Sequence, residues 1–162
     1  ILYKKEQKYR QWSKEVALSN LFKYCATQER CHQDIRTKLI QHQVYGDTLE
    51  DIIATLITEE FLNEERYAMA YVRGKYRMNK WGRNKIIQGL KQKKISPYCI
   101  KKGLKEIDED EYMSNLNRLI EKKLPLVKAK NSYEKRAKVS AYLLQKGYHY
   151  SEIKELLDDY IN

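Results

Sequence analysis

The ten residues IIQGLKQKKI, at positions 86–95, carry apolar side chains at Ile86, Leu90 and Ile95. The four-residue step from Ile86 to Leu90 places both side chains on one face of a helix, which predicts that this face is buried. The same spacing of four and then five residues occurs in two other stretches, IRTKLIQHQV at 35–44 and VSAYLLQKGY at 139–148.

These three copies lie at nearly equal distances along the chain, 51 residues from Leu39 to Leu90 and 53 from Leu90 to Leu143. Each follows a longer stretch of helical periodicity and precedes a second apolar helix. The apolar positions of those following helices are Ile52 and Leu56, Ile100 and Leu104, and Ile153 and Leu157. The pattern predicts an all-α protein of three tandem three-helix repeats. Because each repeat has only a small core, we expect the repeats to stack into an elongated, curved body.

Helix start signals and the repeat period divide the chain. We expect an N-terminal tail at 1–12, a first repeat at 13–60, a basic second repeat at 61–108 and a third repeat at 109–162. Asn63, Ser96 before Pro97, and the acidic run from Asp108 are typical of helix starts, and Thr48 with Asp51 approximates a capping box. The first residues lack a signal-peptide pattern and read as the interior of a longer, non-secreted chain. No apolar run is long enough to span a membrane. We expect the protein to be cytoplasmic and monomeric.

Positive charge is concentrated in one part of this chain. Residues 66–105 contain thirteen Lys or Arg and no Asp or Glu, although the net charge of the whole chain is only +10. The rest of the sequence is therefore slightly acidic. A surface that served only for solvation has no reason to segregate charge in this way, so the pattern predicts an anionic partner for the second repeat.

Helical phase selects the candidate contact residues within this segment. Met69, Val72 and Tyr76 cluster toward the core, and a row of arginines runs beside them, where planar guanidinium groups suit phosphates or carboxylates. The candidates are Arg66, Arg73, Arg77, Lys80, Arg83, Lys85, Lys101 and Lys105. Arg66 has an alternative structural role, in an ion pair with Glu64 or Asp108.

The sequence offers little for catalysis or cofactor binding. It contains neither a Walker A motif nor a dinucleotide-binding fingerprint, and its three histidines have no metal-ligand or triad context. Cys25, Cys31 and His32 lack a fourth ligand for zinc, so we expect no metal and no cofactor, and the cysteines read as small buried residues. Most tyrosines read as core residues, and Trp81 as a packing anchor. Gly82 indicates a turn that needs a positive φ or a close approach.

The stretch FLNEERYAMAYVRGKYRMNKWGRNKIIQGLKQKKIS at 61–96 closely resembles the central motif of the RecX family, regulators of the RecA recombinase. The positions that match the family pattern are Phe61, Glu65, Arg66, Tyr67, Ala68, Lys80, Gly82, Ile86, Leu90 and Ile95. Lys94 stands where the family has a glycine, which puts one helix C-cap in doubt, whereas the third copy keeps Gly147. The resemblance is strong over this stretch and extends more weakly over 13–162.

The resemblance implies three tandem three-helix units and a non-enzymatic protein. Such a protein would bind in the groove of the RecA filament on single-stranded DNA and restrain strand exchange, ATP turnover and coprotease activity in DNA repair and the SOS response. The family motif assigns no catalytic groups, so the contact candidates rest on charge and helical phase. Two alternatives stay open, a free-standing helical DNA- or RNA-binding protein and a helical scaffold whose basic face is incidental.

Overall fold

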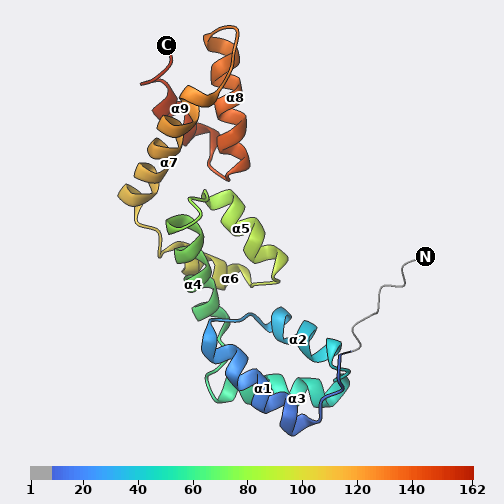
Figure 1. Ribbon diagram of the computed structural model, residues 1–162. Coiled ribbons are helices and arrows are strands. Elements are labelled where there is room, and N and C mark those ends of the chain that lie inside the picture. Colours follow the sequence, from blue (N-terminus) through green and yellow to red (C-terminus); the bar gives the residue numbers. More distant parts are fainter. Residues whose placement is uncertain (1–8) are drawn as a thin grey trace, which may run out of the picture. The chain divides into compact units, whose positions relative to one another are not determined.

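The computed structural model describes residues 9–162, and within them the only regular structure is helical (Figure 1). The α-helices are α1 (Lys14–Thr27), α2 (His32–Gln41), α3 (Gly46–Thr58), α4 (Glu64–Arg77), α5 (Arg83–Gln92), α6 (Pro97–Leu104), α7 (Glu109–Lys123), α8 (Ser132–Gln145) and α9 (Tyr150–Leu157), with a short 3-10 helix η1 (Leu124–Leu126). The prediction of an all-α chain is confirmed. No helix among residues 9–162 has the length and apolar character needed to cross a membrane. Most of the predicted N-terminal tail, residues 1–8, lies outside the described residues.

The helix order reproduces the predicted repeat. We call α1–α3 the first module, α4–α6 the second and α7–α9 the third, and in each the repeated apolar trio begins in the middle helix. All nine side chains of the three trios are buried. Figure 1 shows α1, α2 and α3 as one group of helices, and α7, α8 and α9 as another.

The turn after each middle helix explains why the spacing is four and then five. The helix ends in a Schellman motif, in which the N–H two residues beyond the helix cap bonds back to a carbonyl five residues earlier. These bonds are Val44 to Leu39 at 2.9 Å, Ile95 to Leu90 at 3.1 Å and Tyr148 to Leu143 at 3.2 Å. The residue before each of these donors has a positive φ, namely Gln43 (61°), Lys94 (57°) and Gly147 (101°). The motif therefore turns the third apolar side chain back into the core.

Most predicted helix starts are confirmed. The side chains of Asn63, Ser96 and Asp108 each accept a backbone N–H bond three residues later. The capping box at Thr48 is wrong, because α3 already begins at Gly46 after Tyr45 and Thr48 lies inside its first turn.

The chain divides into two compact units, residues 1–67 and residues 68–162. The core of the first unit is formed by α1, α2 and α3, with Leu21, Leu39 and Leu56 fully buried. The second unit contains most of α4 and the rest of the second and third modules, and its fully buried residues include Tyr76, Tyr112 and Tyr148. The prediction that most tyrosines form core is wrong, because only Tyr67 joins these three among the buried tyrosines of residues 9–162, and six others are exposed: Tyr9, Tyr45, Tyr98, Tyr133, Tyr150 and Tyr160. The three cysteines are buried, as expected.

Candidate anion-binding interface

Helix α4 carries the first three candidate residues. Val72 and Tyr76 are fully buried as expected, whereas Met69 is only half-buried. The helix ends at Arg77, so Lys80 does not continue the row of cations and instead lies in the following turn with a φ of 56°. The predicted helical stripe is therefore confined to the arginines.

Arg66 lies in the first unit and is tied to the first module. Its Nε lies 2.6 Å from a carboxylate oxygen of Glu29, and its guanidinium also donates to the carbonyl of Glu60 at 2.9 Å. Arg66 therefore forms an ion pair, as the alternative prediction allowed, but its partner is Glu29 rather than Glu64 or Asp108. This arginine positions the start of α4.

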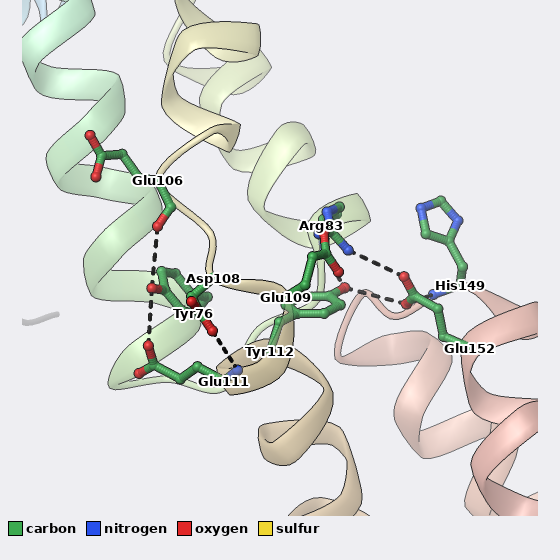
Figure 2. Close-up of polar contacts among 9 residues, drawn as sticks. All are labelled: Tyr76, Arg83, Glu106, Asp108, Glu109, Glu111, Tyr112, His149 and Glu152. Atoms are coloured by element: carbon green, nitrogen blue, oxygen red, sulfur yellow. Dashed lines mark hydrogen bonds and ion pairs between the residues drawn. The ribbon is translucent and has the colours of Figure 1, made fainter.

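Arg73 and Arg77, one turn apart on α4, face one carboxylate from the segment between α6 and α7 and one from the first turn of α7. Arg73 lies 3.5 Å from Glu106, and Arg77 lies 3.6 Å from Glu111. Arg77 also donates to the hydroxyl of Tyr76 at 3.0 Å, and Figure 2 shows that hydroxyl between Glu106 and Glu111. Because both arginine side chains are 40% exposed or more, these ion pairs are weak and leave the guanidinium groups accessible.

Arg83 is the most enclosed of the arginines, with its side chain 20% exposed. Figure 2 shows it between Glu109 and Glu152, with ion pairs to both, the one to Glu152 at 3.3 Å. Its guanidinium also lies 4.2 Å from the centre of the Tyr112 ring. Arg83 therefore joins the second module to the third rather than presenting a free cation.

The main chain completes this joint between α5 and the turn after α8. The first N–H groups of a helix have no partner within the helix. Here Gly82 N–H donates to the carbonyl of Lys146 at 2.8 Å, and Asn84 N–H to that of Gly147 at 2.9 Å. Such close contact requires glycine, since a Cβ on Gly82 would lie 2.2 Å from the carbonyl carbon of Gly147. The φ of Gly82 is −80°, so the close approach explains this residue and a positive φ does not.

Two buried tyrosines add hydrogen bonds to the contact between α5 and the turn after α8. The hydroxyl of Tyr112 accepts the N–H of Arg83 at 2.9 Å and donates to Glu152 at 3.4 Å, while Tyr148 donates to the carbonyl of Lys80 at 2.7 Å. Burial raises the pKa of Tyr112 to about 12, and burial also raises the pKa of Tyr148. Both hydroxyls therefore stay protonated and able to donate at neutral pH.

The positive charge of the second module that has no carboxylate partner is carried by lysines. Among the described residues, no carboxylate lies within ion-pair distance of Lys75, Lys85, Lys101 or Lys105, in contrast to the arginines. Lys101 and Lys105 are exposed, one turn apart at the end of α6. Lys80 donates instead to the carbonyl of Arg77 at 2.7 Å, which fixes the turn.

Lys75 and Lys85 flank one aromatic ring. Their Nζ atoms lie 4.6 Å and 4.5 Å from the centre of the Trp81 ring, and Lys75 also lies 5.4 Å from that of Tyr71. We call the two lysines, Lys75 and Lys85, together with the ring of Trp81, the Trp81 lysine pair. Cation–π contacts hold both ammonium groups in place without neutralising their charge, so the pair can receive phosphate or carboxylate oxygens. Lys75 is not among the residues predicted from charge and helical phase, although the neighbouring letters KYR and WGRNK place cations on both sides of the tryptophan.

Comparison with known proteins identifies the family. Residues 63–104 match the family model for "RecX, second three-helix domain", and residues 109–157 match that for "RecX, third three-helix domain". The "Regulatory protein RecX" of Clostridium acetobutylicum is 32% identical over 153 residues, which cover 91% of this chain and 68% of that protein. The chain belongs to the RecX family. RecX proteins are named as regulators, which agrees with the expectation of a regulatory protein.

Other RecX proteins extend the comparison. The protein of Bacillus mycoides is 27% identical over 158 residues, and that of Clostridium perfringens strain SM101 is 33% identical over 123 residues. The chain spans 58% and 57% of the lengths of these two relatives. The crystal structure of RecX from Lactobacillus salivarius has a TM-score of 0.79 at 23% identity and covers 90% of this chain and 95% of its own, which supports the fold. A second RecX crystal structure has a TM-score of 0.81 at 24% identity, over 90% of this chain and 73% of its own.

Proposed function

We propose that this protein binds the filament that the RecA recombinase forms on single-stranded DNA, and that it inhibits strand exchange, ATP hydrolysis and coprotease activity. The observation that carries the proposal is membership of the RecX family, whose members are named regulatory proteins. The resemblance of residues 61–96 to the central motif of that family implies RecA as the partner. The protein acts as a cytoplasmic monomer and without a cofactor. It performs no chemistry of its own and changes the activity of the assembly that it binds.

The accessible cations of the second module supply the contact in this mechanism. The Trp81 lysine pair and the exposed Lys101 and Lys105 meet phosphates of the bound DNA strand or acidic side chains of the recombinase. Arg73 and Arg77 add to this surface, since they are half-exposed and only loosely paired. Arg66, Lys80 and Arg83 contribute indirectly, because their partners hold α4 and α5 in position.

The decisive test is the rate of ATP hydrolysis by the cognate recombinase on single-stranded DNA. We expect this protein to slow hydrolysis when it is present at well below one copy per recombinase subunit, since binding at few points in a filament affects many subunits. Binding to the same DNA without recombinase is measured in parallel. An unchanged rate across a full titration would contradict the proposal, and tight binding to naked DNA together with that result would favour a free-standing nucleic-acid-binding protein.

A further inference from the structure

A second basic region lies in the third module, outside the surface used above. Residues 122–146 contain eight Lys or Arg and a single acid, Glu134. This segment runs from the end of α7 through η1 to the end of α8. The other acidic residues of the third module lie at the start of α7, at Glu121 near its end, and in and after α9, so the segment from Lys122 to Lys146 carries a local positive charge.

A groove of about 520 Å³ opens on this side, between η1 and α8. Its lining combines cations with apolar surface: Lys123, Leu126, Val127, Lys128, Ala141 and Tyr142. Leu126, in η1, is 75% exposed and available for contact. Apolar surface from Leu126, Val127 and Ala141 thus adjoins the cations Lys123 and Lys128 in one lining.

The loop that forms one wall of the groove is held in place. Lys138 of α8 donates to the carbonyl of Lys128 at 2.7 Å and pairs with Glu134 at 3.0 Å. Glu134 in turn accepts the N–H of Lys130 at 2.9 Å, and this bond, with the help of Lys138, lowers the pKa of its carboxyl group. The only acid of the region is therefore engaged within the wall, and the groove exists before any ligand arrives.

The lining distinguishes between two kinds of anionic ligand. Single-stranded nucleic acid binds by stacking its bases on open aromatic faces. The one aromatic residue of this groove, Tyr142, is half-buried and has Lys123 at 4.4 Å and Lys146 at 6.0 Å from its ring centre. Leu126, Val127 and Ala141 offer bases no stacking partner, but they fit an aliphatic or aromatic side chain of a peptide.

We propose that this groove binds an acidic peptide segment of a partner protein. An apolar side chain of the peptide packs against Leu126 and Ala141, and flanking carboxylates pair with Lys123 and Lys128, which have no carboxylate partner among the described residues. This site depends only on the third module. It is independent of the proposed contact through the second module, because it holds whichever protein supplies the peptide.

The test measures fluorescence anisotropy of a short fluorescein-labelled peptide in which glutamates surround a central leucine. We expect saturable binding to the full chain, weakened about tenfold or more by Lys128→Glu and by Leu126→Asp. Both positions are exposed, and circular dichroism verifies that each variant stays folded. The matched control for Lys128→Glu is Lys154→Glu in α9, which makes the same change of net charge outside the groove and should alter the affinity less than about twofold.

Three results would overturn the proposal. One is that the unmodified chain does not bind the peptide, and another is that Lys154→Glu weakens binding as much as Lys128→Glu, which would indicate charge alone. The third is that a labelled oligothymidylate, rather than the peptide, loses affinity in Lys128→Glu and Leu126→Asp, which would make the groove a nucleic-acid site. A peptide with serine in place of its leucine should bind about tenfold more weakly, and equal binding would contradict the apolar contact.

Discussion

Lys94 shows how one residue can adopt a conformation that its chemistry disfavours. Its φ of 57° lies in the left-handed region, which costs an L-amino acid about 1 kcal/mol relative to glycine. The cap nevertheless forms, since Ile95 returns to the core and its N–H bonds to the carbonyl of Leu90. The doubt about this cap is resolved, because tertiary packing of Ile95 offsets the local strain.

Replacing this lysine should therefore stabilise the protein. We expect Lys94→Gly to raise the free energy of unfolding by about 0.5 to 1 kcal/mol, because glycine adopts a positive φ without strain. Urea denaturation followed by circular dichroism measures the change. The matched control is Gln88→Gly on the exposed face of α5, which should lower the free energy of unfolding by about 1 kcal/mol. A lowered stability in both variants would contradict this account of the turn.

Residues differ in how well their roles can be predicted from sequence. Burial of Ile86 and Leu90 follows from helical period alone, because side chains four residues apart share a face. The partners of the arginines do not follow from it, since Arg66 pairs with a carboxylate 37 positions away and Arg83 with one 69 positions away. Such pairs depend on how modules pack, which periodicity does not encode. The absence of acidic residues from 66–105 therefore does not mean that its arginines are unpaired, because carboxylates from other parts of the chain pair with them.

At the scale of elements, the joint between α5 and the end of α8 is the feature that local sequence signals describe least. A helix start normally uses a capping side chain, but Gly82 has none, and its N-terminal N–H groups bond to the third module instead. Helix dipoles add to this arrangement, because the positive end of α5 meets the negative end of α8. The resemblance to a known family marked Gly82 as a fixed position, and the structure supplies the reason.

The joint makes Gly82 intolerant of any side chain. We expect Gly82→Ala to lower the free energy of unfolding by about 1 to 3 kcal/mol, because the added methyl group meets backbone atoms that cannot rotate away. Thermal and urea denaturation measure the loss. Gly74→Ala, inside α4, is the matched control, since a Cβ there has no neighbour within 4 Å, and it should raise stability by about 0.5 to 1 kcal/mol. Equal effects of the two substitutions would show that the close contact is unimportant.

At the scale of the whole molecule, the spacing of apolar residues predicted the all-α class and the three-helix repeat, and the motif at 61–96 predicted the family. The domain boundaries and the elongated, curved body remain predictions. Net charge is also a property of the whole chain, but its effect depends on which cations stay accessible. Here Lys75, Lys85, Lys101 and Lys105 of the second module have no carboxylate partner among the described residues, whereas Arg66, Arg73, Arg77 and Arg83 each pair with one.

This distribution predicts how filament binding responds to salt. We expect Lys75→Glu with Lys85→Glu to weaken binding to the recombinase filament. We also expect it to make the slope of log affinity against log salt shallower by about 1.4, since each contact to a single-strand phosphate contributes about 0.7. Co-sedimentation at several salt concentrations measures both effects. The control variant, Lys122→Glu with Lys154→Glu, changes the net charge equally outside this segment and should keep the slope of the unmodified protein. An unchanged slope in the first variant would show that these lysines do not contact phosphates.

The bonds that α5 receives from the end of α8 also bear on synthesis of the chain. Ribosomes make the second module before the third, so its helix α5 leaves the exit tunnel with the N–H groups of Gly82 and Asn84 still bound to water. Those groups gain their final partners only after residues 146 and 147 have emerged. The nascent second module therefore completes its fold late, and a truncated translation product that stops before α8 would present the incomplete end of this module to proteases and chaperones.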